Sequence, residues 1–214
     1  MGKFFTILVI ALAATFSTIT YRDRSIPYEN FINTPVVTAF AGGTDGNLIG
    51  MLEETDAVVI QLGLGGRVNG MLDTLEYLRR HPKKTIVIDG ECYSACTMLL
   101  SAPNNVLLTD NARMFFHSGT ETTCVDGLKE TRLSPSANAK MLALFGPAQR
   151  AWIHNTNAFG STDFTEMPKA LVHFVYSDMM ISSQGMPDRI DQDFQTTERP
   201  KPTKPESCRF ILFF

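Results

Sequence analysis

Short runs of consecutive apolar residues alternate with segments of helical periodicity through the middle of the chain. Residues 57–62 predict a buried strand, because they are too continuously apolar for a sheet with one face in water, and residues 84–89 predict another buried strand. Residues 68–80 place apolar side chains at helical spacing and end on Arg79 and Arg80, which suit the negative end of a helix dipole. The same patterns predict further strands at 35–41, 105–109 and 112–116, and short helices at 47–54 and 94–101.

The alternation of strands and helices predicts the fold class. Strand, helix, strand, helix, strand implies an α/β fold in which a parallel sheet is joined by right-handed crossovers and flanked by helices. Further on, Ser134 followed by Pro135 marks the start of a long helix towards residue 157, and the Gly146-Pro147 pair should kink it. Residues 164–176 are expected to add one or two helical turns.

The two ends of the chain differ from its middle. An apolar run at 4–19, with Lys3 before it and arginines after it, predicts a signal peptide or a membrane anchor in residues 1–24. Cleavage and retention stay open, as does an ordinary buried first helix. We expect the folded domain to occupy residues 34–182. Residues 183–214 form a polar, proline-rich tail with an apolar end.

Composition limits the classes of partner. The chain has 214 residues, of which 44% are hydrophobic and 19% charged, as is ordinary for one globular domain with a sizeable core. Its formal net charge is -3 and basic residues are sparse, so nothing indicates binding to nucleic acid.

The four cysteines stand at positions 92, 96, 124 and 208. Their spacing matches no zinc motif, because neither a Cys-x-x-Cys pair nor a pair of histidines accompanies them. In an oxidising compartment we expect a disulfide between Cys124 and either Cys92 or Cys96. Buried free thiols are the alternative.

Three polar or glycine features follow predicted strands. Gly65-Gly66 follows the strand at 57–62, Ser94 lies in the segment Gly-Glu-Cys-Tyr-Ser-Ala-Cys, and His117 follows the strand at 112–116. Open α/β sheets collect reactive groups at the carboxyl ends of their strands. A serine hydroxyl needs a base within hydrogen-bond reach, and a neutral imidazole is the usual base. The pattern therefore predicts Ser94 as a nucleophile and His117 as its base.

These residues resemble the Clp protease proteolytic subunit and its relatives in the crotonase-like superfamily, especially exported ClpP-like proteins, over roughly residues 35–180. The resemblance implies a spiral core of repeated β-β-α units and a serine peptidase site that needs no cofactor. It also implies an oxyanion hole built from the backbone amides of Gly65 or Gly66 and of Ala95.

Several residue roles stay open. The third catalytic member in this family follows the long helix, where Asp163 stands, but Asp163 could instead cap the next helix. Asp178 and Asn157 are reserves, and Lys140 would serve in the Ser-Lys pair that some related signal-peptide peptidases use. Taken alone, Ser94 could be a helix N-cap and His117 a histidine of the core or of a loop.

The sequence as a whole predicts an exported or membrane-anchored serine hydrolase, specifically a peptidase. We expect peptide or protein substrates, self-association, and contact with a membrane through an uncleaved N-terminal segment. The alternatives are an inactive binding or scaffold protein of the same fold, or a cytosolic acyl-CoA enzyme of the wider superfamily.

Overall fold

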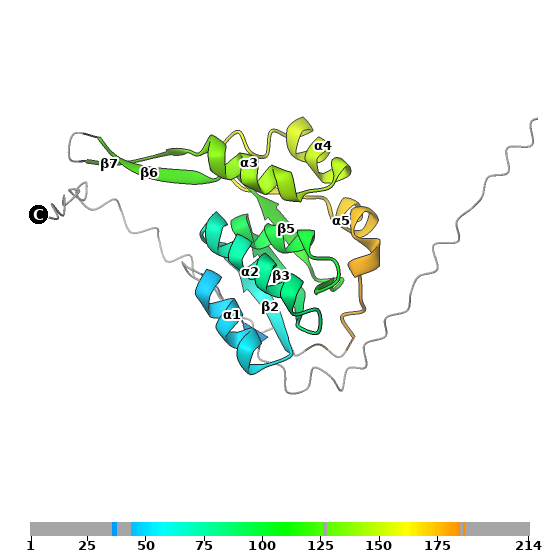
Figure 1. Cartoon of the computed structure of the whole chain (residues 1–214). Coiled ribbons are helices and arrows are strands. Elements are labelled where there is room, and N and C mark those ends of the chain that lie inside the picture. The colour runs from blue at the N-terminus through cyan, green and yellow to red at the C-terminus, as the bar shows by residue number, and fades with distance from the viewer. Residues whose placement is uncertain (1–35, 38–43, 126–127, 185, 187–214) are drawn as a thin grey trace, which may run out of the picture.

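The computed structural model describes residues 36–37, 44–125, 128–184 and 186 (Figure 1). The predictions for residues 1–24 and for the tail from residue 187 onwards lie outside these ranges and stay predictions, as does most of the strand expected at 35–41. Within the described ranges, no helix has the length and apolar character needed to cross a membrane.

The centre of the fold is a six-stranded sheet with the strand order β1-β2-β3-β5-β8, in which β4 also pairs with β3. Every pairing is parallel except that of β5 with β8. The predicted α/β class with a mostly parallel sheet is confirmed. The strands are β1 (Val36–Val37), β2 (Ala57–Gly63), β3 (Thr85–Tyr93), β4 (Val106–Leu108), β5 (Arg113–Phe116) and β8 (Thr165–Glu166).

Helices cover one face of this sheet (Figure 1). The core between them is built from large apolar side chains such as Ile60, Ile88 and Leu99, none of which reaches solvent. On the other face, Val59, Val87 and Leu107 form a smaller buried cluster. Burial on both faces explains why the strand sequences are continuously apolar. The helices are α1 (Thr44–Glu54), α2 (Val68–Arg80), η2 (Ser94–Ser101), α3 (Pro135–Leu144), α4 (Pro147–Asn155), α5 (Lys169–Val175) and η3 (Ser177–Met179).

The structure differs from the sequence-based expectation in three elements. The predicted long helix is broken into α3 and α4 rather than kinked, because a residue before proline is driven out of the helical region, and Gly146 is extended at ψ 167°. The segment at 94–101 is a 3₁₀ helix. A hairpin of β6 (Thr120–Val125) and β7 (Leu128–Leu133) projects from the body (Figure 1) and was not predicted, because its mostly exposed side chains carry no core-facing pattern.

A bulge in β3 sets where that strand ends. Ile60 pairs with Ile88, but Leu62 pairs with Glu91, so β3 contains one extra residue opposite Gln61. Gly90 occupies the bulge, where a Cβ atom would overlap the carbonyl oxygen of Gln61. The strand therefore stays paired with β2 up to Cys92, two residues before Ser94.

A buried carboxylate fixes the connection between β4 and β5. Both strands pair with the same edge of β3, β4 along its first half and β5 along its second. Asp89 lies between these two halves, and its Oδ1 accepts hydrogen bonds from Thr109 Oγ1 at 2.6 Å and Asn111 Nδ2 at 3.1 Å. The chain that leaves β4 is thus tied to β3 immediately before β5 begins.

We predict that Gly90→Ala destabilises the protein because the new methyl group would meet the backbone of β2. The free energy of unfolding should fall by about 1–3 kcal/mol in urea denaturation. Gly50→Ala is the matched control: it lies in α1 with open space around a new Cβ, so it should stabilise by roughly 0.5–1 kcal/mol. Equal effects at the two positions would contradict the role assigned to the bulge.

Candidate active site

The turn from β3 into η2 presents Ser94. Its φ angle is 55°, in the left-handed region that residues other than glycine rarely adopt. Tyr93, not Ser94, is the N-cap of η2, and the Ser94 carbonyl accepts a hydrogen bond from Thr97 Oγ1 at 2.7 Å. The N-cap alternative for Ser94 is therefore wrong. A non-glycine residue held in this conformation is a feature found at functional turns.

His117 meets Ser94 at the end of the neighbouring strand. Tyr93 pairs with Phe115, so the register brings the residues after β3 and β5 to the same edge of the sheet. There, His117 Nε2 lies 2.6 Å from Ser94 Oγ. Burial lowers the pKa of the imidazole below its ordinary value of 6.5. A neutral ring can accept the Ser94 proton at Nε2, which is the arrangement a serine nucleophile requires.

The glycine turn after β2 lies directly against Ser94. Gly65 has a φ of 84°, and a Cβ atom at this position would stand 2.7 Å from Ser94 Cβ and 3.1 Å from the Ala95 amide nitrogen. No residue with a side chain fits here. The close approach brings the backbone of Gly65 against Ser94 Cβ and the Ala95 amide, and Gly66 lines the same cavity as Ser94. An oxyanion hole would need to be at this place.

A disulfide between Cys92 and Cys96 brackets the serine. The expected pairing of either residue with Cys124 is therefore wrong, and so is the free-thiol alternative for these two cysteines. The reason is geometric: the two Cα atoms are 5.4 Å apart beneath the Ser94 turn, whereas Cys124 is exposed on the hairpin strand β6. Cys124 is itself disulfide-bonded.

The second nitrogen of the imidazole is buried. Within the described part of the chain, His117 Nδ1 makes no hydrogen bond. Asp163 is exposed, and its local hydrogen bonds are with Ser161, through the Asp163 amide at 3.1 Å and the Asp163 carboxylate at 3.5 Å. The next residue, Phe164, contacts His117 edge-on, with ring centroids 4.6 Å apart. The segment that carries Asp163 therefore reaches the imidazole, but its carboxylate does not bond to it.

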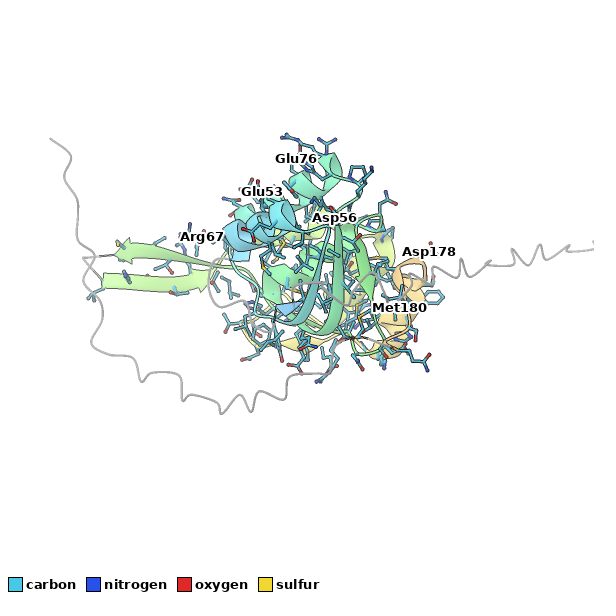
Figure 2. All side chains as sticks on the ribbon, turned by 90° about the horizontal axis from the view of Figure 1, so that it is seen from below. Glu53, Asp56, Arg67, Glu76, Asp178 and Met180 are labelled. Atoms are coloured by element: carbon cyan, nitrogen blue, oxygen red, sulfur yellow. A yellow bond between two sulfur atoms is a disulfide. The ribbon has the colours of Figure 1, made fainter. Side chains whose placement is uncertain are left out.

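The other residues considered as third catalytic members make no hydrogen bond to His117 Nδ1. Asn157 is exposed after α4, and Asp178 is exposed in η3. Figure 2 shows Asp178 on the side of the body opposite Arg67, which lines the cavity at Ser94. Lys140 does line this cavity, but its ammonium group donates to Asn69 Oδ1 at 2.8 Å. Asp163 does not cap α5, whose N-cap is Pro168.

The cavity beside Ser94 and His117 has a volume of about 810 Å³. One wall comes from residues 66–70 at the start of α2, and another from Gly119, Thr120 and Glu121 at the start of β6. It carries charges of both signs, since Arg67 and Lys140 line it together with Asp73 and Glu121. Among the described residues, no cluster of histidine, cysteine, aspartate or glutamate has a geometry suited to a metal ion.

Asn138 is a site residue that the sequence analysis missed. Its Oδ1 accepts from the Gly119 amide at 2.7 Å, and its Nδ2 donates to Ser118 Oγ at 2.9 Å. This one side chain on α3 therefore fixes the two residues that follow His117. An asparagine inside a helical segment gives no sequence signal for such a role.

Side-chain contacts link the neighbouring strands β3, β5 and β8 beside the site. Arg113 on β5 forms ion pairs with Glu91 on β3 at 2.7 Å and with Glu166 on β8 at 2.8 Å. Beside it, the rings of Tyr93 and Phe115 stack with centroids 4.3 Å apart. Burial, followed by the hydrogen bond to Glu91, raises the pKa of the Tyr93 hydroxyl to about 12. These contacts hold β3 and β5 in the register that brings Ser94 to His117.

Comparison with known proteins gives distant structural similarity only. No family model matches the chain, and no curated protein matches it. A mutant of the 1510-N membrane-bound stomatin-specific protease is 12% identical, with a TM-score of 0.44, covering 71% of this chain and 80% of that one. A peptidase from Plasmodium falciparum is 7% identical, with a TM-score of 0.45 and coverages of 68% and 93%. A second mutant of the stomatin-specific protease, in complex with a substrate peptide, is 13% identical, with a TM-score of 0.41 and coverages of 70% and 75%. The function proposed below rests on the geometry of the site.

We predict that the pKa of His117, followed by NMR, lies below 6.5 and rises towards that value in Phe164→Ala, because removing the ring lets water reach the imidazole. Reactions that need the neutral ring should therefore be lost only as the pH falls through this lowered pKa. Phe174→Ala is the control, since Phe174 is 77% exposed on α5. A pKa of His117 that Phe164→Ala leaves unchanged would contradict the assigned cause.

Proposed function

We propose that this protein is a serine hydrolase, and specifically a peptidase, in which Ser94 is the nucleophile and His117 the general base. The observation that carries the proposal is the 2.6 Å contact between Ser94 Oγ and His117 Nε2 at a left-handed turn beside a glycine turn. Burial lowers the pKa of the imidazole and so favours its neutral form, which a general base requires.

The reaction follows from these positions. Ser94 Oγ attacks the carbonyl carbon of the substrate while its proton passes to His117 Nε2. The negative charge that develops on the carbonyl oxygen is stabilised by backbone N–H groups of the Gly65-Gly66 turn and of Ala95. The imidazolium then gives its proton to the leaving amine, the C–N bond breaks, and water hydrolyses the acyl-enzyme by the same route.

The buried Nδ1 of His117 needs a partner when the ring becomes charged, because an unpaired charge in a desolvated site is costly. We assign this role to Asp163. Phe164 already touches the imidazole, so a local shift of the exposed segment 161–164 would bring the neighbouring carboxylate to Nδ1. The expectation is supported by this proximity, and by the finding that no residue the structure describes makes a hydrogen bond to Nδ1.

A peptide substrate suits the shape and lining of the cavity. The cavity lies between the chain that follows the glycine turn and the start of β6. Extended peptides commonly bind by pairing their backbone with such segments. Its volume of about 810 Å³ falls in the range that binds small molecules and short peptide segments.

Export and self-association belong to the same proposal. The apolar run at 4–19 and the Cys92–Cys96 disulfide support an oxidising, extracytoplasmic location. Self-association is supported by the projecting β6–β7 hairpin, which exposes Val125, Leu128 and Leu133. Two-stranded hairpins are marginally stable by themselves in water, so a partner surface would stabilise this one.

The second candidate is a binding protein that keeps the fold but has no turnover. The unpartnered Nδ1 of His117 favours it, because a base without an orienting partner is less effective. The third hypothesis, an acyl-CoA enzyme, requires a cytosolic protein, and cell fractionation tests whether the protein is cytosolic.

We predict that a fluorophosphonate labels the protein covalently at Ser94. Ser94→Ala should abolish labelling, and His117→Ala should slow it by at least about 100-fold, because general-base catalysis contributes about that much. Ser101→Ala is the matched control: this serine lies at the other end of η2 and donates to the Met98 carbonyl at 2.7 Å. If the folded wild-type protein does not label, the binding-protein reading replaces the peptidase.

We further predict that Asp163→Asn slows labelling by at least about tenfold, since the amide cannot stabilise the imidazolium as a carboxylate does. Asp110→Asn, an exposed substitution after β4, should leave the rate unchanged. If Asp163→Asn labels like the wild type while Lys140→Met does not, the Ser-Lys alternative is correct instead.

A further inference from the structure

The Cys92–Cys96 disulfide encloses the proposed nucleophile. Cys92 is on the last part of β3, Cys96 is in the first turn of η2, and Ser94 is the middle residue of the loop between them. Cys92 is also the residue of β3 that pairs with Gly63 on one side and Met114 on the other. The disulfide therefore joins the centre of the sheet to the helix that carries the Ala95 amide.

The surroundings of the disulfide leave no spare space. Cys92 is fully buried and Cys96 is 3% exposed. A Cβ atom at Gly63 would lie 2.5 Å from Cys96 Sγ, so the sulfur lies directly against the backbone of β2. Gly63 comes just before the Gly65-Gly66 turn. Cys96 Sγ thus lies against β2 just before the turn that supplies one half of the proposed oxyanion hole, and Cys96 directly follows Ala95, which supplies the other half.

We propose that this disulfide positions Ser94 and makes the site depend on redox state, active when oxidised and inactive when reduced. This inference rests on the proposed function. A non-glycine residue with a φ of 55° persists only where its surroundings hold it, and the disulfide is the covalent link across the turn. Cys92 and Cys96 are thereby positioning residues, which act on the reaction through Ser94.

Reduction would disturb the turn for a steric reason. Atoms that are not bonded stay about 3.5–4.0 Å apart, so two thiols need more room than one disulfide. Gly63 blocks movement of Cys96 Sγ towards β2, and β3 is fixed by its pairing on both sides. The movable part is the turn itself, so Ser94 Oγ would leave His117 Nε2.

The reducing agent is a dithiol, of small-molecule or protein origin. Because Cys96 is only 3% exposed, its thiolate reaches Cys96 Sγ when the Ser94 turn opens locally. The thiolate then attacks Cys96 Sγ, the S–S bond breaks, and Cys92 takes up a proton as a thiol. The second thiol of the reductant then displaces Cys96, which also becomes a thiol, and the reductant leaves as a disulfide. Two electrons and two protons pass from the dithiol to the two cysteines, and an oxidant of the disulfide class reverses the reaction.

The test compares labelling by a fluorophosphonate before and after treatment with dithiothreitol, followed by removal of the reductant without air. We expect the rate at Ser94 to fall at least tenfold on reduction and to recover on reoxidation, while circular dichroism shows a folded protein. Cys124→Ser is the matched control, because it removes the disulfide that Cys124 forms and should respond in the same way as the wild type. An unchanged rate in protein shown to be reduced overturns the proposal.

A substitution cycle tests the same contact without a reductant, in case the reduced protein unfolds. Gly63→Ala should slow labelling at least tenfold in the oxidised protein, where the new methyl group meets Cys96 Sγ. In the Cys92→Ala/Cys96→Ala variant, which lacks both sulfur atoms, adding Gly63→Ala should slow labelling by a much smaller factor. If Gly63→Ala slows labelling by the same factor with and without the two cysteines, the proposal is overturned.

An NMR titration of His117 separates this proposal from the proposed function. If the oxidised protein does not label at all, the hydrolase is wrong, but the pKa of His117 still reports the burial of the imidazole beside Ser94. We expect that pKa to shift on reduction and to return on reoxidation. A pKa of His117 that is the same in both redox states overturns the positioning role of the disulfide.

Discussion

The close approach of two backbone turns is the constraint on which the rest of the site depends. The chain that leaves β2 at Gly63 passes within contact distance of the turn from β3 into η2. Gly63 accommodates the sulfur of Cys96, and Gly65 accommodates Ser94 Cβ and the backbone of Tyr93 and Ala95. Neither contact leaves room for a side chain. The two turns meet because the Gly90 bulge keeps β3 paired with β2 up to Cys92.

The position of His117 depends on a second set of contacts. β4 and β5 share one edge of β3, and Asp89 ties the connection between them to that strand. Arg113 and the stacked rings of Tyr93 and Phe115 then fix β5 laterally. Asn138, from α3, holds the chain immediately after the imidazole. The pairing of β5 with β3 thus places His117 beside Ser94, and Asn138 on α3 holds the residues that follow His117.

Much of the fold and the central pair of the site could be predicted from the sequence. Apolar runs identified β2 and β3, helical spacing identified α2 at the same residues that the structure gives, and both Ser94 and His117 follow predicted strands. These features are local, so sequence periodicity carries them. Their catalytic roles stay predictions that the contact between Ser94 and His117 supports.

The remaining features depend on contacts between segments that are distant in sequence, or on which of several nearby residues pair with one another. The Cys92–Cys96 pairing was missed because the left-handed turn that brings the two cysteines together has no signature in a serine. The β6–β7 hairpin was missed because strands without a buried face lack an apolar alternation. Asn138 acts across 19 positions on Gly119, and neither the spacing nor the residue type indicates that contact.

A crystal structure of the protein after reaction with a fluorophosphonate would show whether Ser94 is the nucleophile. We expect a covalent bond from Ser94 Oγ to phosphorus, with the phosphonyl oxygen within hydrogen-bond distance of the Ala95 amide and of an amide in the Gly65-Gly66 turn. We also expect His117 Nε2 to stay beside the modified oxygen. A phosphonyl group on another residue, or one whose oxygen points away from these amides into solvent, would contradict these assignments.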